Sequence, residues 1–339
     1  MSQNGKRITL ADVAAEAGVS MSSVGNVIRG HPHVRQSVRD RVQEAVEKLG
    51  YRPLAIGQNL RYGRTGMISL AIPNFAQPYF AEIARRTVQA AAAHDLRVNV
   101  QQTDNDLERE RDASDAWKLG TSDGLIFSPS VISDEEIERR RGAMPLVLLG
   151  EHSKLTTLDR VGIDSVTVGT MATQHLVDTG RRRIGMLGHK VFGDASVVSE
   201  REQGYQEVLD TAGLSRPFPI IEVTDWTRTD GLTATRQLLA DGPQFDALFC
   251  ANDLLALGAL RAMHEAGRRV PEDVAIVGVD DIEESSFSEP TLTTVAIDRE
   301  WMIDTAMAML SIRIADPAAE PRQVSTPLRL VIRDSTCRP

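Results

Sequence analysis

Residues 8–30 read ITLADVAAEAGVSMSSVGNVIRG, and this stretch has the pattern of two short helices joined by a tight turn. Thr9 followed three residues later by Asp12 is a helix-capping pattern, because the hydroxyl accepts an unpaired helix N–H and the acid faces the positive end of the helix dipole. Gly18 ends the first helix, since glycine enters the left-handed conformation at little cost. Ser20 begins a second helix, so the stretch predicts a helix-turn-helix.

A third helix is expected at about residues 36–48, ended by Gly50. In a helix-turn-helix the second helix enters the DNA major groove with its N-terminal residues at the base edges. Asn pairs with adenine and Arg with guanine through two hydrogen bonds each. The outward positions expected to read bases are Met21, Ser22, Gly25, Asn26 and Arg29, and the residues expected to position the helix on the DNA are Thr9, Ser20, Ser23, His33, Arg35, Arg39 and Tyr51. A three-helix domain that binds protein is the alternative.

The charge distribution separates the N-terminal segment from the rest of the chain. The 339 residues carry a formal net charge of -9. Residues 1–62 nevertheless hold nine Lys and Arg against five acids, so the remainder is strongly acidic. A basic module on an acidic body is typical of a nucleic-acid-binding end, although a solvated basic face would give the same balance.

The composition is that of a globular protein, with 42% hydrophobic and 25% charged residues. No apolar run approaches the roughly 18 residues that a membrane helix needs, and the N-terminus has no apolar segment typical of a secretory signal. Cys250 and Cys337 cannot make a disulfide framework. We therefore expect a cytoplasmic protein with no membrane partner.

From residue 66 onward the sequence alternates between apolar strands and amphipathic helices. Strands are expected at 67–72, 96–101, 124–127, 146–149, 184–187, 220–223, 247–250 and 274–277, with helices between them and a final strand within 327–339. Repeated strand–helix units form parallel sheets covered on both faces. The units fall into two series, which predicts an α/β body of two doubly wound parallel-sheet subdomains behind an all-α headpiece.

Ligands of doubly wound sheets bind outside the carboxyl ends of the strands, so residues that follow strands are candidates for a cleft between the subdomains. These candidates are Tyr79, Phe80, Ser128, Arg201, Trp226, Asn252 and Asp280. Ligand hydroxyls would pair with the Asp, Asn and Arg side chains, and a sugar face would stack on an aromatic ring. Simpler roles stay open: Asn252 and Asp280 as caps, Trp226 as a core or surface aromatic, and Arg201 as a surface ion-pair partner.

The sequence lacks the short motifs of several common enzyme classes. No Gly-x-Gly-x-x-Gly follows the first predicted strand, and no Gly-Lys-Ser/Thr phosphate loop or Gly-x-Ser-x-Gly turn is found. The histidines are scattered, and no His/Cys spacing suits zinc. We therefore expect no catalytic residues, no cofactor and no metal.

Residues 8–30, together with VRQSVRDRVQEAVEKLGYRP at 34–53, resemble the DNA-binding headpiece of the LacI/GalR family of repressors. The body resembles the effector domain of that family, whose relatives are periplasmic sugar-binding proteins. The resemblance implies a homodimeric regulator that binds an inverted-repeat operator and a small-molecule effector. It also implies a helix-turn-helix headpiece at 1–52, a hinge helix or linker at 53–64, and an effector-binding and dimerisation domain at 65–339, with crossovers near 161–166, 288–293 and 320–328.

The resemblance assigns roles to individual residues. Leu60 matches the hinge position that wedges between base pairs at the operator centre, although a plain tether is the alternative. The positions matching family effector contacts or pocket walls are Arg201, within an Arg-x-x-Gly-aromatic run, Asn252, Asp280, Tyr79, Phe80 and Trp226.

Five positions depart from the family pattern, among them Gly57, which replaces a usual alanine of the linker. Gly25 and Asn26 stand where the family usually has a Ser-Arg pair, which predicts an altered operator preference. Arg35 replaces the usual Ser or Thr cap of the third helix. Gly150 stands where some sugar-binding members carry Asp, so the identity of the sugar does not follow from the resemblance.

These features together predict a DNA-binding transcription regulator, namely a repressor whose operator affinity is controlled by a sugar or sugar derivative in the cleft. A regulator that uses a corepressor or a non-sugar ligand is the alternative. A solute-binding protein and a sugar-active enzyme are the rivals from other classes, and the headpiece and the missing catalytic motifs count against them.

Overall fold

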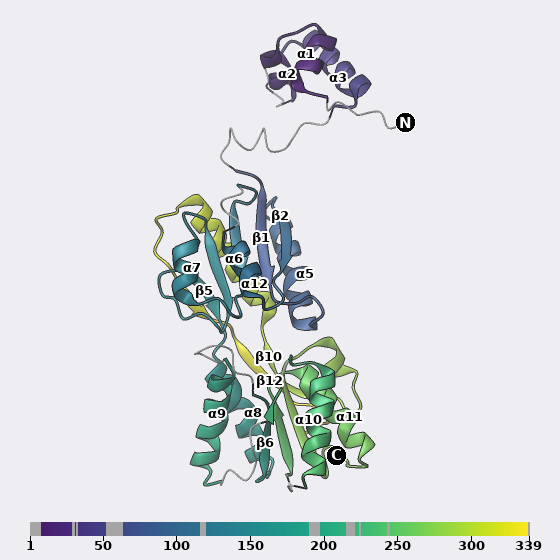
Figure 1. Cartoon of the computed structure of the whole chain (residues 1–339), viewed down its shortest axis with the longest axis vertical. Helices are drawn as coiled ribbons and strands as arrows, with labels where there is room; N and C mark the ends of the chain where they lie inside the picture. Colours follow the sequence, from purple (N-terminus) through teal and green to yellow (C-terminus); the bar gives the residue numbers. More distant parts are fainter. Residues whose placement is uncertain are drawn as a thin grey trace. The chain divides into compact units, whose positions relative to one another are not determined.

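The computed structural model of the chain describes residues 8–28, 31, 33–51, 64–115, 120–189, 197–214, 221–223, 225–242 and 245–337. The chain divides into two compact units, Met1–Thr65 and Gly66–Pro339 (Figure 1). Two residues with predicted roles, Arg29 and Leu60, lie outside the described residues, as does most of the predicted hinge at 53–64.

The first unit is a small three-helix domain made of α1 (Leu10–Ala17), α2 (Met21–Ile28) and α3 (Gln36–Leu49). The cap predicted for α1 is present, since Thr9 Oγ1 accepts from the Asp12 amide at 3.3 Å and Asp12 accepts from the Thr9 amide at 2.7 Å. Gly18 ends α1 with a φ of 62°, in the left-handed region. A small core of Val and Ala side chains from the three helices holds the domain together.

The second unit contains two six-stranded sheets. The first has the order β11-β5-β4-β3-β1-β2 and the second has the order β12-β10-β9-β8-β6-β7. Among the described residues, the strands pair in parallel except for β10 with β12, which is antiparallel. The strands are β1 (Met67–Ile72), β2 (Arg97–Gln102), β3 (Gly124–Phe127), β4 (Leu146–Gly150), β5 (Asp159–Gly162), β6 (Ile184–His189), β7 (Ile221–Glu222), β8 (Ala247–Cys250), β9 (Ala275–Asp280), β10 (Thr293–Ile297), β11 (Gln323–Ser325) and β12 (Leu328–Val331).

Helices cover both faces of each sheet (Figure 1). They are α5 (Pro78–Ala92), α6 (Leu107–Ser114), α7 (Asp134–Arg140), α8 (Ser165–Asp178), α9 (Val197–Thr211), α10 (Arg228–Ala240), α11 (Asp253–Glu265) and α12 (Arg299–Ala315), with a short 3-10 turn at Glu283–Ser286. Helices α5 and α12 pack on one face of the first sheet, and α6 and α7 pack on the other. Helices α8 and α9 cover one face of the second sheet, and α10 and α11 cover the other. The predicted pair of doubly wound subdomains is confirmed.

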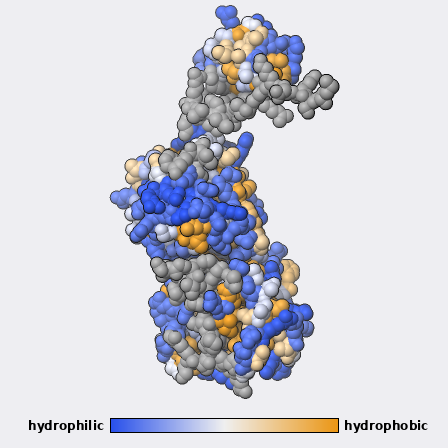
Figure 2. Space-filling view, viewed as in Figure 1, coloured by the Kyte–Doolittle hydropathy of each residue, from blue (hydrophilic) through white to orange (hydrophobic). Residues whose placement is uncertain are grey.

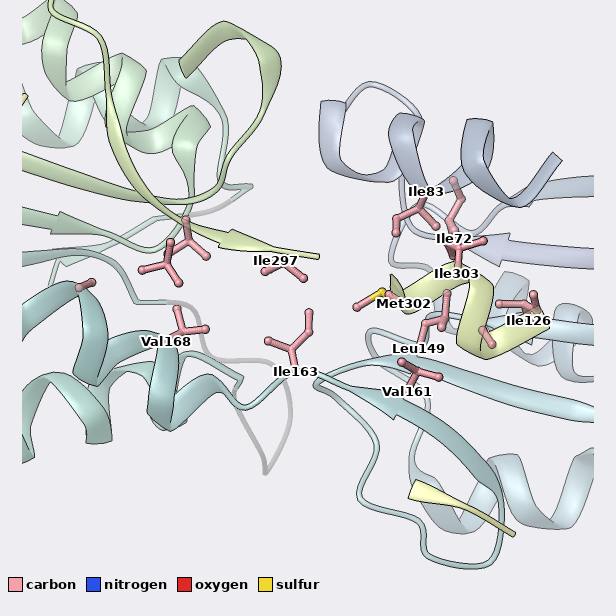
Figure 3. Close-up of a cluster of buried hydrophobic side chains, with 14 of the residues drawn as sticks. Ile72, Ile83, Ile126, Leu149, Val161, Ile163, Val168, Ile297, Met302 and Ile303 are labelled. Carbon is pink, nitrogen blue, oxygen red and sulfur yellow. The ribbon is translucent and has the colours of Figure 1, made fainter. Parts of the chain in front are cut away.

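The chain passes between the two sheets at three places. It leaves the first sheet after β5 at Gly162, returns after β10 at Ile297, and leaves again after β11 at Ser325. The crossover expected near 288–293 is therefore wrong, because Thr293–Ile297 still pairs with β9 in the second sheet. Ile163 and Ile297, one from each of the first two crossings, extend the buried apolar cluster between the subdomains (Figure 3).

The surface of both units is mainly hydrophilic in the view of Figure 2, with small apolar patches between the polar residues. Within the described ranges, no helix has both the length and the apolar character needed to cross a bilayer.

Candidate functional site

A cavity of about 150 Å³ lies where the carboxyl ends of the strands of the two subdomains meet. We call this cavity, with its lining residues, the cleft. It lies at the edge where doubly wound sheets bind their ligands. The cleft brings together all seven residues that the sequence predicts for effector binding: Tyr79, Phe80, Ser128, Arg201, Trp226, Asn252 and Asp280.

The most buried charged group of the cleft is Arg201, on α9. Its side chain is 3% exposed, and its Nη2 donates to Glu151 Oε1 at 2.7 Å. Its Nη1 donates to the carbonyl of Ala251, and its guanidinium lies 5.4 Å from the centre of the Trp226 ring. The sequence left open that Arg201 is an ion-pair partner at the surface. Arg201 does form an ion pair, but the pair is buried.

Two other residues of the Arg-x-x-Gly-aromatic run, Gly204 and Tyr205, fix the position of Arg201. Gly204 lets α9 approach α8 closely, since a Cβ added there would lie 2.1 Å from the carbonyl oxygen of Val166. Gly169 on α8 also allows this close approach, since a Cβ added there would lie 2.0 Å from the carbonyl oxygen of Arg201. Tyr205 is buried, and its hydroxyl donates to the carbonyl of Ile184 at 2.7 Å. The run therefore fixes α9 against α8 and β6 and aims Arg201 into the cleft.

Glu151 is a cleft residue that the sequence analysis missed. It follows β4, beside Gly150, and its second oxygen accepts from the hydroxyl of Ser165 at the start of α8. Burial raises the pKa of the Glu151 carboxyl, and the charge of Arg201 opposes that rise. Its position directly after a strand was a usable signal, because the same rule found Ser128 and Asn252. The other lining residues missed include Asn105, His152 and Asp225.

Asn252 combines a capping role with a place in the cleft. Its Oδ1 accepts from the amide of Leu255 at 2.9 Å, which makes it the N-cap of α11. Its Nδ2 donates to the carbonyl of Trp226 at 3.2 Å. The same side chain therefore begins a helix and holds the backbone of an aromatic wall of the cleft.

Trp226 and Asp280 both have strained backbone conformations, with φ values of 56° and 111°. Residues held in the left-handed region without being glycine cluster at ligand sites. The indole Nε1 of Trp226 is buried and has no hydrogen-bond partner among the described residues. A buried donor without a partner is costly, so this atom points to a ligand acceptor.

Asp280 ends β9 and lies near a second buried carboxyl group, that of Asp253. Burial, together with the charge of Asp253, raises the pKa of Asp280 to about 8. Burial likewise raises the pKa of Asp253 to about 7, against the donors Ser285, Thr294 and the Ile282 amide. The Arg299 guanidinium donates to the backbone carbonyls of Asp280 and Asp281, which fixes this strand end.

The cleft therefore offers hydrogen-bond acceptors, donors and aromatic faces to one ligand. Carboxylates only accept, the indole N–H only donates, and a ligand hydroxyl can do both. Tyr79 and Phe80 begin α5 with their rings at 5.1 Å in an edge-to-face arrangement, and they form the aromatic edge of the cleft. This combination suits a polyhydroxylated ring.

The outer face of α2 is the candidate DNA-reading surface. Met21 is 56% exposed and Ser22 is exposed, while Asn26 is half-buried. Ser20 accepts from the Ser23 amide at 3.2 Å, which caps α2 as the sequence predicts. Gly25, expected among the outward positions, is instead buried, because glycine has no side chain that could extend from the helix.

The residues expected to position the headpiece on DNA differ in their exposure. Thr9, His33 and Arg35 are exposed, and Tyr51 is half-buried against the headpiece core. Arg39 donates to the carbonyl of His31 at 3.0 Å. Arg35 begins α3 without a side-chain capping hydrogen bond, in agreement with the weakened cap that the sequence predicts.

Comparison with known proteins gives a family match at each end of the chain. Residues 9–53 match the bacterial regulatory proteins of the lacI family, and residues 173–336 match the periplasmic binding protein-like domain. The HTH-type transcriptional regulator CelR of Thermobifida fusca is 32% identical over 342 residues, which span 97% of this chain and 98% of that protein.

Two solved structures resemble the chain over almost its whole length. The CelR–cellobiose complex has 31% identity and a TM-score of 0.72, and covers 97% of this chain and 100% of that one. The lac repressor dimer bound to operator and the anti-inducer ONPF has 28% identity and a TM-score of 0.84, and covers 98% of this chain and 100% of that one.

Proposed function

The chain belongs to the LacI family of bacterial regulatory proteins, which are DNA-binding transcription regulators, and we propose that it is a repressor whose operator affinity is set by a sugar bound in the cleft. One observation carries the proposal: the seven residues expected to bind an effector, scattered from 79 to 280 in the sequence, line a single cavity. Their donors and acceptors fit hydroxyl groups.

We propose that the seven predicted cleft residues, together with Glu151, bind the sugar. CelR, a relative at 31% identity, is solved with cellobiose, which supports a carbohydrate as the ligand class. The cleft lies between two subdomains whose relative angle a ligand can bias. A ligand shifts such an equilibrium only by its differential affinity for the two states, so cleft residues from both subdomains are needed.

We propose that the headpiece at 1–52 reads the operator and that 53–64 is a hinge whose Leu60 enters the minor groove. Ser22, Asn26 and Arg29 are the proposed base-reading residues. The residues predicted to position the headpiece are proposed to contact the DNA backbone. The related lac repressor binds operator as a dimer. Two headpieces joined in a dimer read two half-sites about one helical turn apart.

We propose that the second unit forms the homodimer. Phe287 is 79% exposed, and aromatic side chains are enriched in the cores of protein interfaces. Phe287→Asp is expected to convert a dimer to a monomer in sedimentation-velocity runs, while the circular dichroism spectrum stays unchanged. A dimer that persists in this variant contradicts the assignment of Phe287 to the interface.

A thermal-shift screen against neutral mono- and disaccharides tests the proposed function. A ligand at 100 times its Kd stabilises a protein by about 2.7 kcal/mol, which is readily measured. Arg201→Ala is expected to abolish the stabilisation, and retention of the full shift would place the ligand elsewhere. A corepressor would tighten operator binding instead of weakening it, a solute-binding protein would bind no operator, and an enzyme would consume the sugar.

A further inference from the structure

The charged groups around the cleft are unequal in number. Among the described residues, four carboxyl groups lie in or beside it against two guanidinium groups: those of Glu151, Asp225, Asp253 and Asp280 against those of Arg201 and Arg299. Three of the four carboxyl groups line the cavity itself, whereas Arg299 lies behind Asp280 and does not line it. Carboxyl groups therefore outnumber guanidinium groups in the described part of the cleft.

The basic groups that the structure describes near the cleft are already engaged by oxygen atoms of the protein. Arg201 donates to Glu151 at 2.7 Å and to the carbonyl of Ala251. Arg299 donates to backbone carbonyls, with Asp281 O at 3.0 Å. His152 Nε2 lies 3.1 Å from the carbonyl of Ile132. An anionic ligand group would have to compete with a buried carboxylate for Arg201.

The surroundings of Asp280 show how the cleft treats negative charge. Burial and the neighbouring Asp253 raise the pKa of Asp280 to about 8, and Glu151 contributes in the same direction. A raised pKa means that the site disfavours an added negative charge. A phosphate or carboxylate on a ligand would meet the same burial and the same neighbours, so its negative charge would also be disfavoured.

We propose that the cleft accepts uncharged polyhydroxylated ligands and rejects their phosphorylated and carboxylated forms, with Glu151 as the residue that determines this selectivity. The inference rests on the proposed function, because it names the class of sugar. A hydroxyl can donate to Glu151 or Asp280 and accept from the unpaired Trp226 Nε1. A phosphate dianion offers only acceptors, and it would bring its negative charge against the buried Glu151 carboxylate.

Matched ligands test the proposal on the wild-type protein. Thermal-shift titrations compare each neutral sugar of the panel with its 6-phosphate and its uronic acid at the same ionic strength. The neutral sugar that binds is expected to bind at least about tenfold more tightly than either anionic form. An anionic form that binds as tightly as its neutral parent, or more tightly, overturns the inference.

Glu151→Gln tests the residue assignment, since the amide keeps the shape and removes the charge. The preference for the neutral sugar over its 6-phosphate is expected to fall by about tenfold in this variant. Glu200→Gln is the matched control, because Glu200 pairs with Lys154 at 2.7 Å outside the lining of the cleft. An unchanged preference in Glu151→Gln removes Glu151 from the account.

The outcomes separate this inference from the proposed function. If an anionic sugar binds and its neutral parent does not, the sugar-controlled regulator stands and the selectivity fails. If no sugar of either kind stabilises the protein, the proposed function fails, and the inference fails with it.

Discussion

Arg201 on α9 donates to Glu151 at the end of β4 at 2.7 Å, and this ion pair joins the two subdomains inside the cleft. The two side chains are 3% and 14% exposed, so water screens the pair little. Glu151 also accepts from Ser165 of the second subdomain. A ligand that engages either partner therefore acts on a contact that depends on the angle between the subdomains.

Arg201→Met is expected to destabilise the protein by about 3–5 kcal/mol, because it leaves Glu151 buried without its counter-charge. Adding Glu151→Gln to this variant is expected to recover a large part of that loss. Urea unfolding of the two single variants, the double variant and the wild type gives the coupling energy of the pair. A double variant whose loss equals the sum of the two single losses would show that the pair contributes no coupling.

Asn252 allows its capping role and its cleft role to be separated. Asn252→Ala is expected to cost about 1 kcal/mol of unfolding free energy through the lost cap of α11. Asn252→Ser keeps a capping oxygen but removes the amide N–H that Asn252 donates to the Trp226 carbonyl. We expect Asn252→Ser to melt close to the wild type and to bind the sugar several-fold more weakly; wild-type affinity in this variant would make the residue a cap alone.

The raised pKa of Asp280 makes stability depend on pH. The folded protein keeps a proton on Asp280 up to about pH 8, whereas the unfolded chain releases it at about pH 4. Unfolding then releases a proton, so stability falls as the pH rises between those two values, by up to about 1.4 kcal/mol per pH unit. Asp280→Asn removes this contribution.

Urea unfolding of wild type and Asp280→Asn at pH 5, 6 and 7 measures the effect. The free energy of unfolding is expected to fall more steeply with pH in the wild type than in the variant. Glu320→Gln, at an exposed carboxyl group, serves as the control and should keep the wild-type slope. Parallel slopes for wild type and Asp280→Asn would mean that Asp280 is ionised in the folded protein.

Asn26 is expected to carry part of the operator specificity. Asn26→Ala should weaken binding to the DNA upstream of the gene by about 1–3 kcal/mol and leave nonspecific binding unchanged. Glu47→Gln, at an exposed position of α3, is the control. Fluorescence anisotropy with specific and scrambled duplexes at one salt concentration reads both affinities. Equal losses on both duplexes would assign Asn26 to the DNA backbone instead of the bases.

Local signals in the sequence predicted much of the fold. The Thr9–Asp12 cap and the left-handed Gly18 set the first helix, because both act through neighbouring residues. Asn252 and Asp280 were predicted as cleft residues because each stands at the end of a parallel strand, where the fold itself brings ligand-binding residues together.

Long-range pairing explains what the sequence did not reveal. The short strand β5 pairs with β11, more than 160 residues later in the chain. The sequence near Asp159–Gly162 contains no local signal that indicates this partner. The antiparallel edge β12 and the late return to the first sheet after Ile297 have the same origin. The Glu151–Arg201 pair joins residues 50 apart in sequence, and only the packed subdomains bring them into contact.

A sugar in the cleft is proposed to control operator binding, and fluorescence anisotropy with a labelled duplex from the DNA upstream of the gene tests this control most directly. The full-length protein is titrated with and without a saturating amount of the neutral sugar that stabilises it. The sugar is expected to change the operator Kd of the wild type by at least about fivefold. It is expected to leave the operator Kd of Arg201→Met unchanged. Identical wild-type affinities with and without the sugar would contradict it.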